Sequence, residues 1–195
     1  MPPIDRVLLA RLQRRDEKAF DRLVTENQDA VLGYLSRMLG SREEALDVAQ
    51  EVFLAAFRFI DQFRGDSSLK TWLFRIAINL CKNHLRYRDR RHVRSQRSFD
   101  DVIEKPGFNP VGSRSDSPEA VLSGKEQEAL LKDGIQALPV DFREVLVLRD
   151  LELLSYEEVG ELTGLPEGTV KSRIHRARLQ LMEYVRTHNR GRDET

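Results

Sequence analysis

Residues 154–181 place cationic side chains beside an apolar stripe at helical spacing. Apolar residues recur at intervals of 4, 3 and 4, which predicts one buried helix face formed by Val170, Ile174, Ala177 and Leu181. Cationic or polar side chains fall off this stripe: Lys171, Ser172, His175, Arg176 and Arg178. Residues 168–186 hold five Lys/Arg and one acid, Glu183, so the outer face of this helix should attract phosphate groups.

The residues before this basic helix carry the signals of a second, shorter helix and a tight turn. Ser155 and Glu158 have the spacing of a capping box, in which each side chain bonds the other residue's backbone N–H. Gly164 suits the left-handed position that ends a helix, and Pro166 suits the first turn of the next helix. A helix-turn-helix that enters the DNA major groove fits this order. An ordinary amphipathic pair with a solvated charged face is the alternative, and the charge imbalance favours DNA.

A second basic cluster closes the helix predicted over residues 69–94. Its cations are Lys82, Arg86, Arg88, Arg90, Arg91 and Arg94, and the aromatic residues near it in sequence are Phe63, Trp72, Phe74 and Tyr87. Cations beside aromatic rings suit single-stranded or melted DNA, where unstacked bases are available. For Trp72 and Phe74 core packing is the favoured alternative, because both match the apolar period of the helix.

Composition predicts a helical protein without disulfides. The 195 residues include 32 basic and 32 acidic ones, so the net charge of zero hides the two basic segments. The lone cysteine, Cys81, lies in an apolar helical pattern and is expected to be a small buried hydrophobe. The sequence shows no apolar run of membrane-spanning length and no signal peptide, which predicts a cytoplasmic location.

The order of these patterns predicts an all-α fold with two small domains. The first domain is expected over residues 1–94, with a capping box at Ser41 and Glu44 and a turn at 63–68. Residues 95–118 are rich in proline, glycine and serine, which predicts a flexible linker. The second domain is expected over 119–190, with a frayed tail after Thr187. The sequence shows no strand pattern and no repeat.

Long blocks of the chain resemble a known family. These blocks are DVAQEVFLAAF (47–57), FRGDSSLKTWLFRIAINLCKNHLR (63–86) and ALPVDFREVLVLRDLELLSYEEVGELTGLPEGTVKSRIHRAR (137–178). Together they resemble bacterial RNA polymerase sigma factors of the sigma-70 family, in the extracytoplasmic-function (ECF) class and close to the sigma-E type. The resemblance implies two helical domains, sigma region 2 and a helix-turn-helix region 4, which bind core RNA polymerase and promoter DNA.

The resemblance also implies roles for particular residues. The surface that grips the β′ clamp helices of polymerase would comprise Asp47, Gln50, Glu51 and Leu54. The minus-ten element would be read, one base being flipped out, by Phe63, Arg64, Gly65, Asp66, Ser67, Ser68, Asn79, Lys82 and Arg86. The minus-thirty-five element would be read by Lys171, Ser172, Arg173, His175, Arg176 and Arg178. Residues 142–149 would meet the β flap, and the linker would run toward the RNA exit path.

The resemblance implies an anti-sigma partner, of a kind that is often membrane-bound in this family, and neither a cofactor, a metal nor a small-molecule substrate. In two features the sequence departs from the family pattern: the titratable His175 lies on the reading helix, and the linker is not strongly acidic.

Two other functions compete with this interpretation. A stand-alone helix-turn-helix regulator would explain residues 119–186, but it would not need the basic and aromatic end of the first domain. A nuclease would need a carboxylate cluster for Mg²⁺ or a His/Glu constellation. The four histidines are scattered and Asp66 has no carboxylate near it in sequence, so no enzymatic activity is expected.

Overall fold

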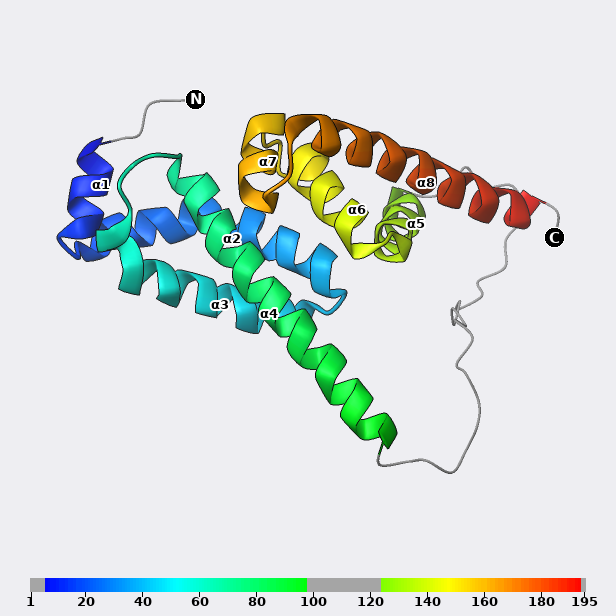
Figure 1. The fold of residues 1–195 in the computed structure, drawn as a ribbon, viewed down its shortest axis with the longest axis horizontal. Coiled ribbons are helices and arrows are strands. Elements are labelled where there is room, and N and C mark those ends of the chain that lie inside the picture. Colours follow the sequence, from blue (N-terminus) through cyan, green and yellow to red (C-terminus); the bar gives the residue numbers. More distant parts are fainter. Residues whose placement is uncertain (1–5, 98–123, 194–195) are drawn as a thin grey trace.

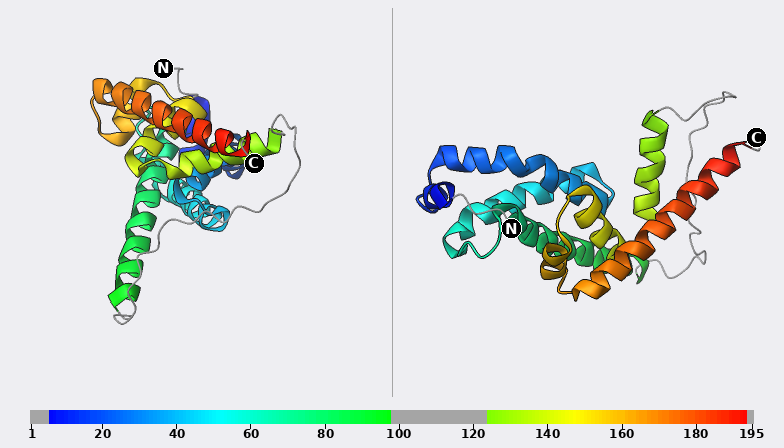
Figure 2. Two further views of the ribbon diagram at one scale, coloured as in Figure 1. Left: turned by 90° about the vertical axis from the view of Figure 1, so that its right-hand side faces the viewer. Right: turned by 90° about the horizontal axis from the view of Figure 1, so that it is seen from above.

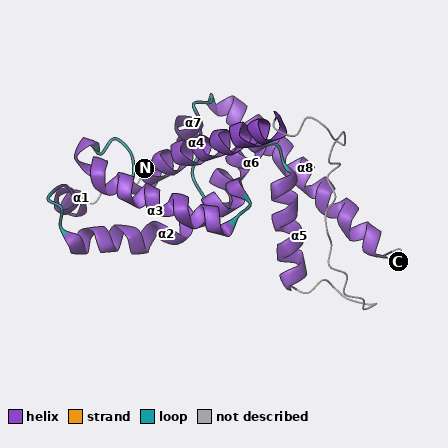
Figure 3. Ribbon diagram, turned by 90° about the horizontal axis from the view of Figure 1, so that it is seen from below, coloured by secondary structure: helices purple, strands orange, loops and turns teal. Residues whose placement is uncertain are grey.

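The structure is a computed structural model that describes residues 6–97 and 124–193. Every regular element in these ranges is helical, which confirms the predicted fold class (Figure 3). The first part contains α1 (Arg6–Gln13), α2 (Glu17–Leu39), α3 (Arg42–Phe59), the short 3₁₀ helix η1 (Ile60–Gln62) and α4 (Leu69–Arg97). The second part contains α5 (Gly124–Ala137), α6 (Val140–Leu146), the π-helical turn η2 (Val147–Leu151), α7 (Tyr156–Thr163) and α8 (Glu167–Asp193). Most of the predicted linker, residues 98–118, lies outside the described residues.

The first bundle packs α2, α3 and α4 around an apolar core. Phe74 is fully buried and meets Tyr34 edge-on, with ring centroids 5.6 Å apart. Trp72 is also buried, so the core alternative is confirmed for both aromatic residues of α4. The thiol of Cys81 is buried as well, as expected. The basic C-terminal half of α4 projects away from the rest of the molecule (Figures 1 and 2).

The start of α3 differs in one detail from the predicted capping box. The Ser41 side chain accepts a hydrogen bond from the Glu44 backbone N–H at 3.3 Å, so the forward half of the box is present. The Glu44 carboxylate contacts α4 instead of reaching back, at 3.1 Å from His84 Nε2 and 3.6 Å from Arg88 Nη1. The acid expected to cap its own helix therefore ties α3 to α4.

The second bundle holds the predicted helix-turn-helix in α7 and α8. The capping box of Ser155 and Glu158 is complete, and Gly164 ends α7 with a left-handed φ of 72°. A Cβ on Gly160 would lie 2.9 Å from the Leu165 carbonyl oxygen, so the turn requires glycine at this position. Helix α8 continues to Asp193, past Thr187, so the residues of the tail that was expected to fray extend the helix as far as Asp193.

The two bundles contact each other, which no sequence pattern predicted. Helix α4 packs on α7, and α2 packs on α5 and α6. Figure 1 shows α7 and α6 close to the crossing of α2 and α4. In the described residues, no helix combines the length and apolarity needed to cross a membrane.

Candidate nucleic-acid interface

The loop between η1 and α4 exposes polar side chains and is held in place by buried ones. Phe63 is buried against Trp72, with ring centroids 5.0 Å apart, and Ser67 is buried too. The Ser68 hydroxyl accepts a hydrogen bond from the Thr71 backbone N–H at 3.0 Å and so caps α4. Gly65 has a φ of 81°, which lets the chain turn sharply between the exposed side chains of Arg64 and Asp66. The loop is thus fixed at both ends and exposes a cation and a carboxylate.

The polar side chains that α4 was predicted to offer to DNA are not all equally accessible. Asn79 and Arg86 are exposed. Lys82 instead forms an ion pair with Glu144 of the second bundle, at 3.0 Å. Arg88 donates to the Leu39 carbonyl oxygen at 3.1 Å, which satisfies the C-terminal end of α2. Exposed cations continue along the projecting part of α4 at Arg90 and Arg91, whereas the side chain of Arg94 lies outside the described residues.

The first turns of α8 carry the residues predicted to read duplex DNA. Lys171 pairs with Glu167 at 2.6 Å, and this hydrogen bond raises the pKa of the lysine. The Ser172 hydroxyl donates to the Thr169 carbonyl oxygen at 3.0 Å. His175 and Arg176 are exposed on the same part of the helix. On one side, α8 borders a hollow of about 450 Å³ lined by the beginning of α6 and by Thr169, Ser172, Arg173 and Arg176.

Two further cations of α8 are held by acids of the second bundle. Arg173 lies 3.4 Å from an Asp141 carboxylate oxygen. Arg178 binds both oxygens of Asp150, at 2.6 and 2.8 Å, and this bidentate bond raises the pKa of the guanidinium. Arg178 thereby fixes α8 to η2, a role that its place in the basic run did not indicate.

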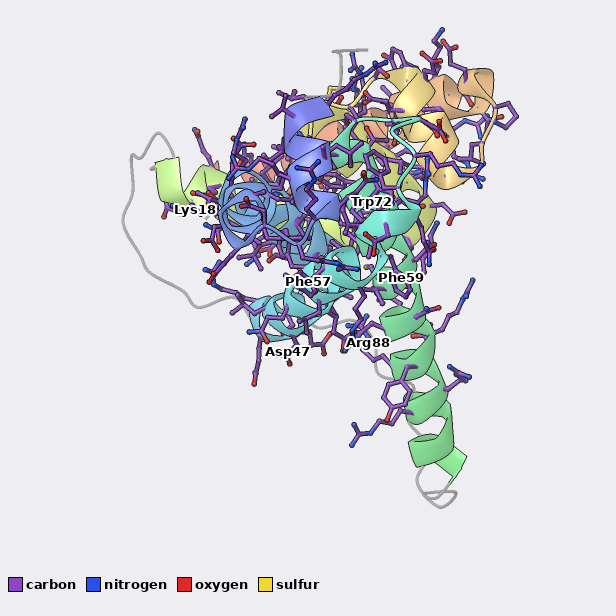
Figure 4. All side chains as sticks on the ribbon, turned by 90° about the vertical axis from the view of Figure 1, so that its left-hand side faces the viewer. Lys18, Asp47, Phe57, Phe59, Trp72 and Arg88 are labelled. Atoms are coloured by element: carbon purple, nitrogen blue, oxygen red, sulfur yellow. The ribbon has the colours of Figure 1, made fainter. Side chains whose placement is uncertain are left out.

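The exposed face of α3 combines acids with apolar side chains. Asp47, Gln50 and Glu51 are exposed, and Leu54 is 57% exposed. Phe57 and Phe59 are also exposed, but they are two residues apart and so point to different sides of α3, as Figure 4 shows. Phe57 packs on Phe20, with ring centroids 4.8 Å apart. An exposed leucine flanked by acidic and polar side chains can serve as the apolar anchor of a protein-binding surface.

Sequence reasoning missed a group of acids in the second bundle that meets α4. Thr71 Oγ1 donates to Glu158 at 2.9 Å, and Arg75 pairs with Glu161 at 2.6 Å. Glu144 and Glu152 are both only 6% exposed. Burial raises the pKa of Glu152, and Lys70 and Arg37 act in the opposite direction. The one sequence signal was the place of Glu144 directly before the apolar residues 145–148.

Comparison with known proteins assigns a family model to each bundle. Sigma-70 region 2 matches residues 23–91, and Sigma-70 region 4 matches residues 128–181. The RNA polymerase sigma-H factor of Pseudomonas aeruginosa is 45% identical over 174 residues, which span 89% of this chain and 90% of that protein. The ECF RNA polymerase sigma-E factor of Escherichia coli K12 is 42% identical over 176 residues, with 89% and 90% covered.

A solved structure matches over both bundles. It is the sigma factor RpoE in complex with the anti-sigma factor NepR, from Bartonella quintana. The sequence identity is 26% and the TM-score 0.63, and the match covers 87% of this chain and 98% of that chain.

Proposed function

The chain belongs to the sigma-70 family, in its ECF class, and we propose that its two domains divide promoter recognition between duplex and single-stranded DNA. It is an alternative sigma factor that directs RNA polymerase to promoters, and the stand-alone regulator is not favoured. The proposed domains are residues 1–94 and 119–190, joined by a linker over 95–118. The observation that carries the proposal is the presence, in one chain, of a helix-turn-helix and of a fixed loop beside a basic helix.

The second domain would read the duplex minus-thirty-five element through the first turns of α8. Support comes from the exposed His175 and Arg176 and from Lys171 and Arg173, whose partner acids are themselves exposed. Exposed ion pairs contribute little, about 0–1 kcal/mol, so phosphates or base edges can replace these acids at small cost. Arg178 would act mainly by holding α8 in place, because Asp150 already occupies its guanidinium.

The first domain would capture a base of the minus-ten element in the loop at residues 63–68. Arg64 and Asp66 are the exposed polar side chains there, while Phe63 and Ser67 would support the loop from below. Asn79 lies farther along α4 and would be a second polar reader, with Lys82 and Arg86 on phosphates. Capture of a flipped base offsets the unstacking cost of a few kcal/mol and so favours the open bubble.

The exposed face of α3 would dock on the polymerase. Asp47, Gln50 and Glu51 supply charge and hydrogen bonds, and Leu54 supplies an apolar anchor. Residues 142–149 would contribute a second contact at the β flap through the half-buried Phe142, Arg143 and Arg149, because residues 144–148 are buried. The proposed activity involves binding alone, without catalysis or a cofactor, and would take place with RNA polymerase in the cytoplasm. The complex of RpoE with NepR supports the further proposal that an anti-sigma factor regulates this chain.

Run-off transcription with core polymerase tests the docking surface. The promoter template is chosen by sequencing the transcripts that the reconstituted polymerase makes from genomic DNA. A Glu51→Arg, Leu54→Glu variant should lose transcription and co-elution with core polymerase while its circular dichroism stays unchanged. The control Asp29→Arg makes the same charge change as Glu51→Arg, at an exposed site of α2, and should transcribe normally. Full activity of the α3 variant would refute the docking surface.

A further inference from the structure

We propose that this chain inhibits itself: without polymerase, acidic residues of the second domain cover the cations of α4 and close the single-strand site. The inference rests on the proposed role of α4 in binding the minus-ten strand. The closed state is the arrangement in which α7 lies on α4 and α5 and α6 lie on α2.

Two ion pairs join α4 to the second domain. Lys82 Nζ lies 3.0 Å from Glu144 Oε1, and Arg75 Nη2 lies 2.6 Å from Glu161 Oε1. A carboxylate oxygen at these distances takes the place that a phosphate oxygen would take on the same cation. DNA must therefore displace the second domain before it can bind these side chains.

Hydrogen bonds extend the same contact toward the beginning of α4. Lys70 Nζ donates to the Glu152 carbonyl oxygen at 2.8 Å. Thr71 Oγ1 donates to Glu158 Oε1 at 2.9 Å and contacts the hydroxyl of Ser68 at 2.7 Å. Ser68 belongs to the loop proposed to hold the flipped base, so the second domain is linked directly to that loop.

The buried acids show that the closed arrangement is specific. Of the residues that the structure describes, Glu144 and Glu152 are the buried acidic side chains. A buried carboxylate is costly unless a cation or hydrogen-bond donor faces it. The cations that face them, Lys82 for Glu144 and Arg37 at 3.8 Å for Glu152, come from the first domain.

The second domain also donates hydrogen bonds to the carbonyl groups at the C-terminal end of α2. The Gln136 side-chain amide donates to the Arg37 carbonyl oxygen, and Arg143 Nη1 donates to the Met38 carbonyl oxygen at 3.0 Å. Terminal carbonyls of a helix carry partial negative charge and lack partners within the helix. This contact joins the two domains at the end of α2, where Arg88 of α4 also binds the Leu39 carbonyl oxygen, so opening requires it to break together with the ion pairs.

The proposed polymerase surfaces lie on both domains, at the exposed face of α3 and at residues 142–149. Within residues 142–149, Arg143 and Glu144 already bind the first domain in the closed state. Polymerase that engages this segment would compete with closure and free α4 at the same time. The single-strand site would thus become available on the polymerase and remain covered on the free chain.

The first experiment measures closure in the full chain. Spin labels at Lys18→Cys and Gln180→Cys, in a Cys81→Ala background, report the distance between the domains by double electron–electron resonance. With the wild-type interface, the distances between the two labels should form one narrow distribution. Glu144→Lys with Glu161→Arg faces Lys82 and Arg75 with like charges and should shift the distribution to longer, broader distances. Long, broad distances with the unmodified interface would overturn closure.

Matched variants separate opening from unfolding. Lys82→Glu with Arg75→Glu opens the interface from the α4 side. Combining these two substitutions with Glu144→Lys and Glu161→Arg exchanges the charges within both ion pairs and should restore the narrow distance distribution. The control Glu128→Lys with Glu157→Arg changes two exposed acids of the second domain and should stay closed. If both openers kept the narrow distribution, or if the swap failed to restore it, the ion pairs would not hold the domains together and the proposal would fall.

The second experiment measures masking without polymerase. The probe is a fluorescein-labelled single strand that carries the minus-ten element of a transcribed promoter. Glu144→Lys with Glu161→Arg leaves α4 intact and should bind the strand about ten-fold more tightly than the equally charged control Glu128→Lys with Glu157→Arg, as expected if the closed state holds about 90% of the free chain. An opened variant that binds no more tightly than this control would overturn masking. Normal run-off transcription by wild type in that case would leave the proposed function standing.

Discussion

Replacing Glu158 by alanine should weaken both the helix-turn-helix and the contact between the domains. The Glu158 carboxylate accepts a hydrogen bond from the Ser155 backbone N–H at 2.8 Å, which is the reciprocal half of the capping box. It also accepts a hydrogen bond from the hydroxyl of Thr71 at 2.9 Å, across the contact between the domains. One carboxylate thus stabilises the start of α7 and holds α7 on α4.

The size of the effect follows from these two bonds. Loss of a helix cap costs about 0.5–2 kcal/mol, and loss of a hydrogen bond to a partly exposed carboxylate costs about 1 kcal/mol. The Glu158→Ala variant should therefore lose about 2 kcal/mol in the free energy of unfolding. Thr71→Val removes only the bond between the domains and should lose about 1 kcal/mol.

The same effect should depend on pH. Burial alone would raise the pKa of Glu158, but the hydrogen bonds from Ser155 and Thr71 outweigh it and hold the pKa below the usual 4.5. A carboxyl whose pKa is lowered by folding stabilises the folded state above its unfolded pKa, and this stabilisation is lost as the pH falls through the folded pKa. The difference between wild type and Glu158→Ala should be complete at pH 7 and shrink below about pH 4.5.

Urea unfolding followed by circular dichroism, at pH 7 and at steps down to pH 3, measures this difference. Glu158→Gln is the control, because it keeps an acceptor oxygen but does not titrate. The difference in stability between Glu158→Gln and Glu158→Ala should therefore not depend on pH in this way. A constant difference between wild type and Glu158→Ala across this range would contradict the lowered pKa of Glu158. An alanine variant as stable as wild type at pH 7 would contradict the stabilising role of the carboxylate.

Three further predictions concern single positions. Burial first, and then the Glu144 carboxylate, raise the pKa of Cys81 to about 12, so its thiol should react with Ellman's reagent at pH 8 far more slowly than in urea-unfolded protein; equal rates would contradict this burial. Gly160→Ala should lower the melting temperature and cost about 1–3 kcal/mol, because its Cβ would meet the Leu165 carbonyl; an unchanged melting temperature would contradict this. Leu153 is 78% exposed with a φ of 61°, so Leu153→Gly should stabilise the protein by about 0.5–1 kcal/mol in urea unfolding, and a loss of stability would count against backbone strain there.

The helix-turn-helix could be predicted from sequence because its signals are local. The Ser155 cap, the Gly164 turn and the stripe of Val170 and Ile174 each depend on neighbours within a few residues, and the structure confirms all of them. The capping acid proposed at Glu44 was half wrong, because His84, forty residues away, competes for the same carboxylate.

The contact between the domains could not be predicted in the same way. Thr71 and Glu158 are 87 residues apart in sequence, and Arg75 and Glu161 are 86 apart. A glutamate within a helix has the same local pattern whether it faces solvent or a distant lysine, so the burial of Glu144 depends on tertiary packing alone. The roles of the individual DNA-facing residues stay predictions until they are measured.

Transcription from a template melted in advance tests the division of labour between the domains most directly. Asp66→Ala in the loop and Arg176→Ala on α8 are compared on a duplex promoter and on the same promoter with an unpaired minus-ten region. Both variants should transcribe the duplex poorly, and melting in advance should restore transcription by Asp66→Ala much more than by Arg176→Ala. Equal restoration of both variants, or of neither, would contradict separate reading of single strand and duplex.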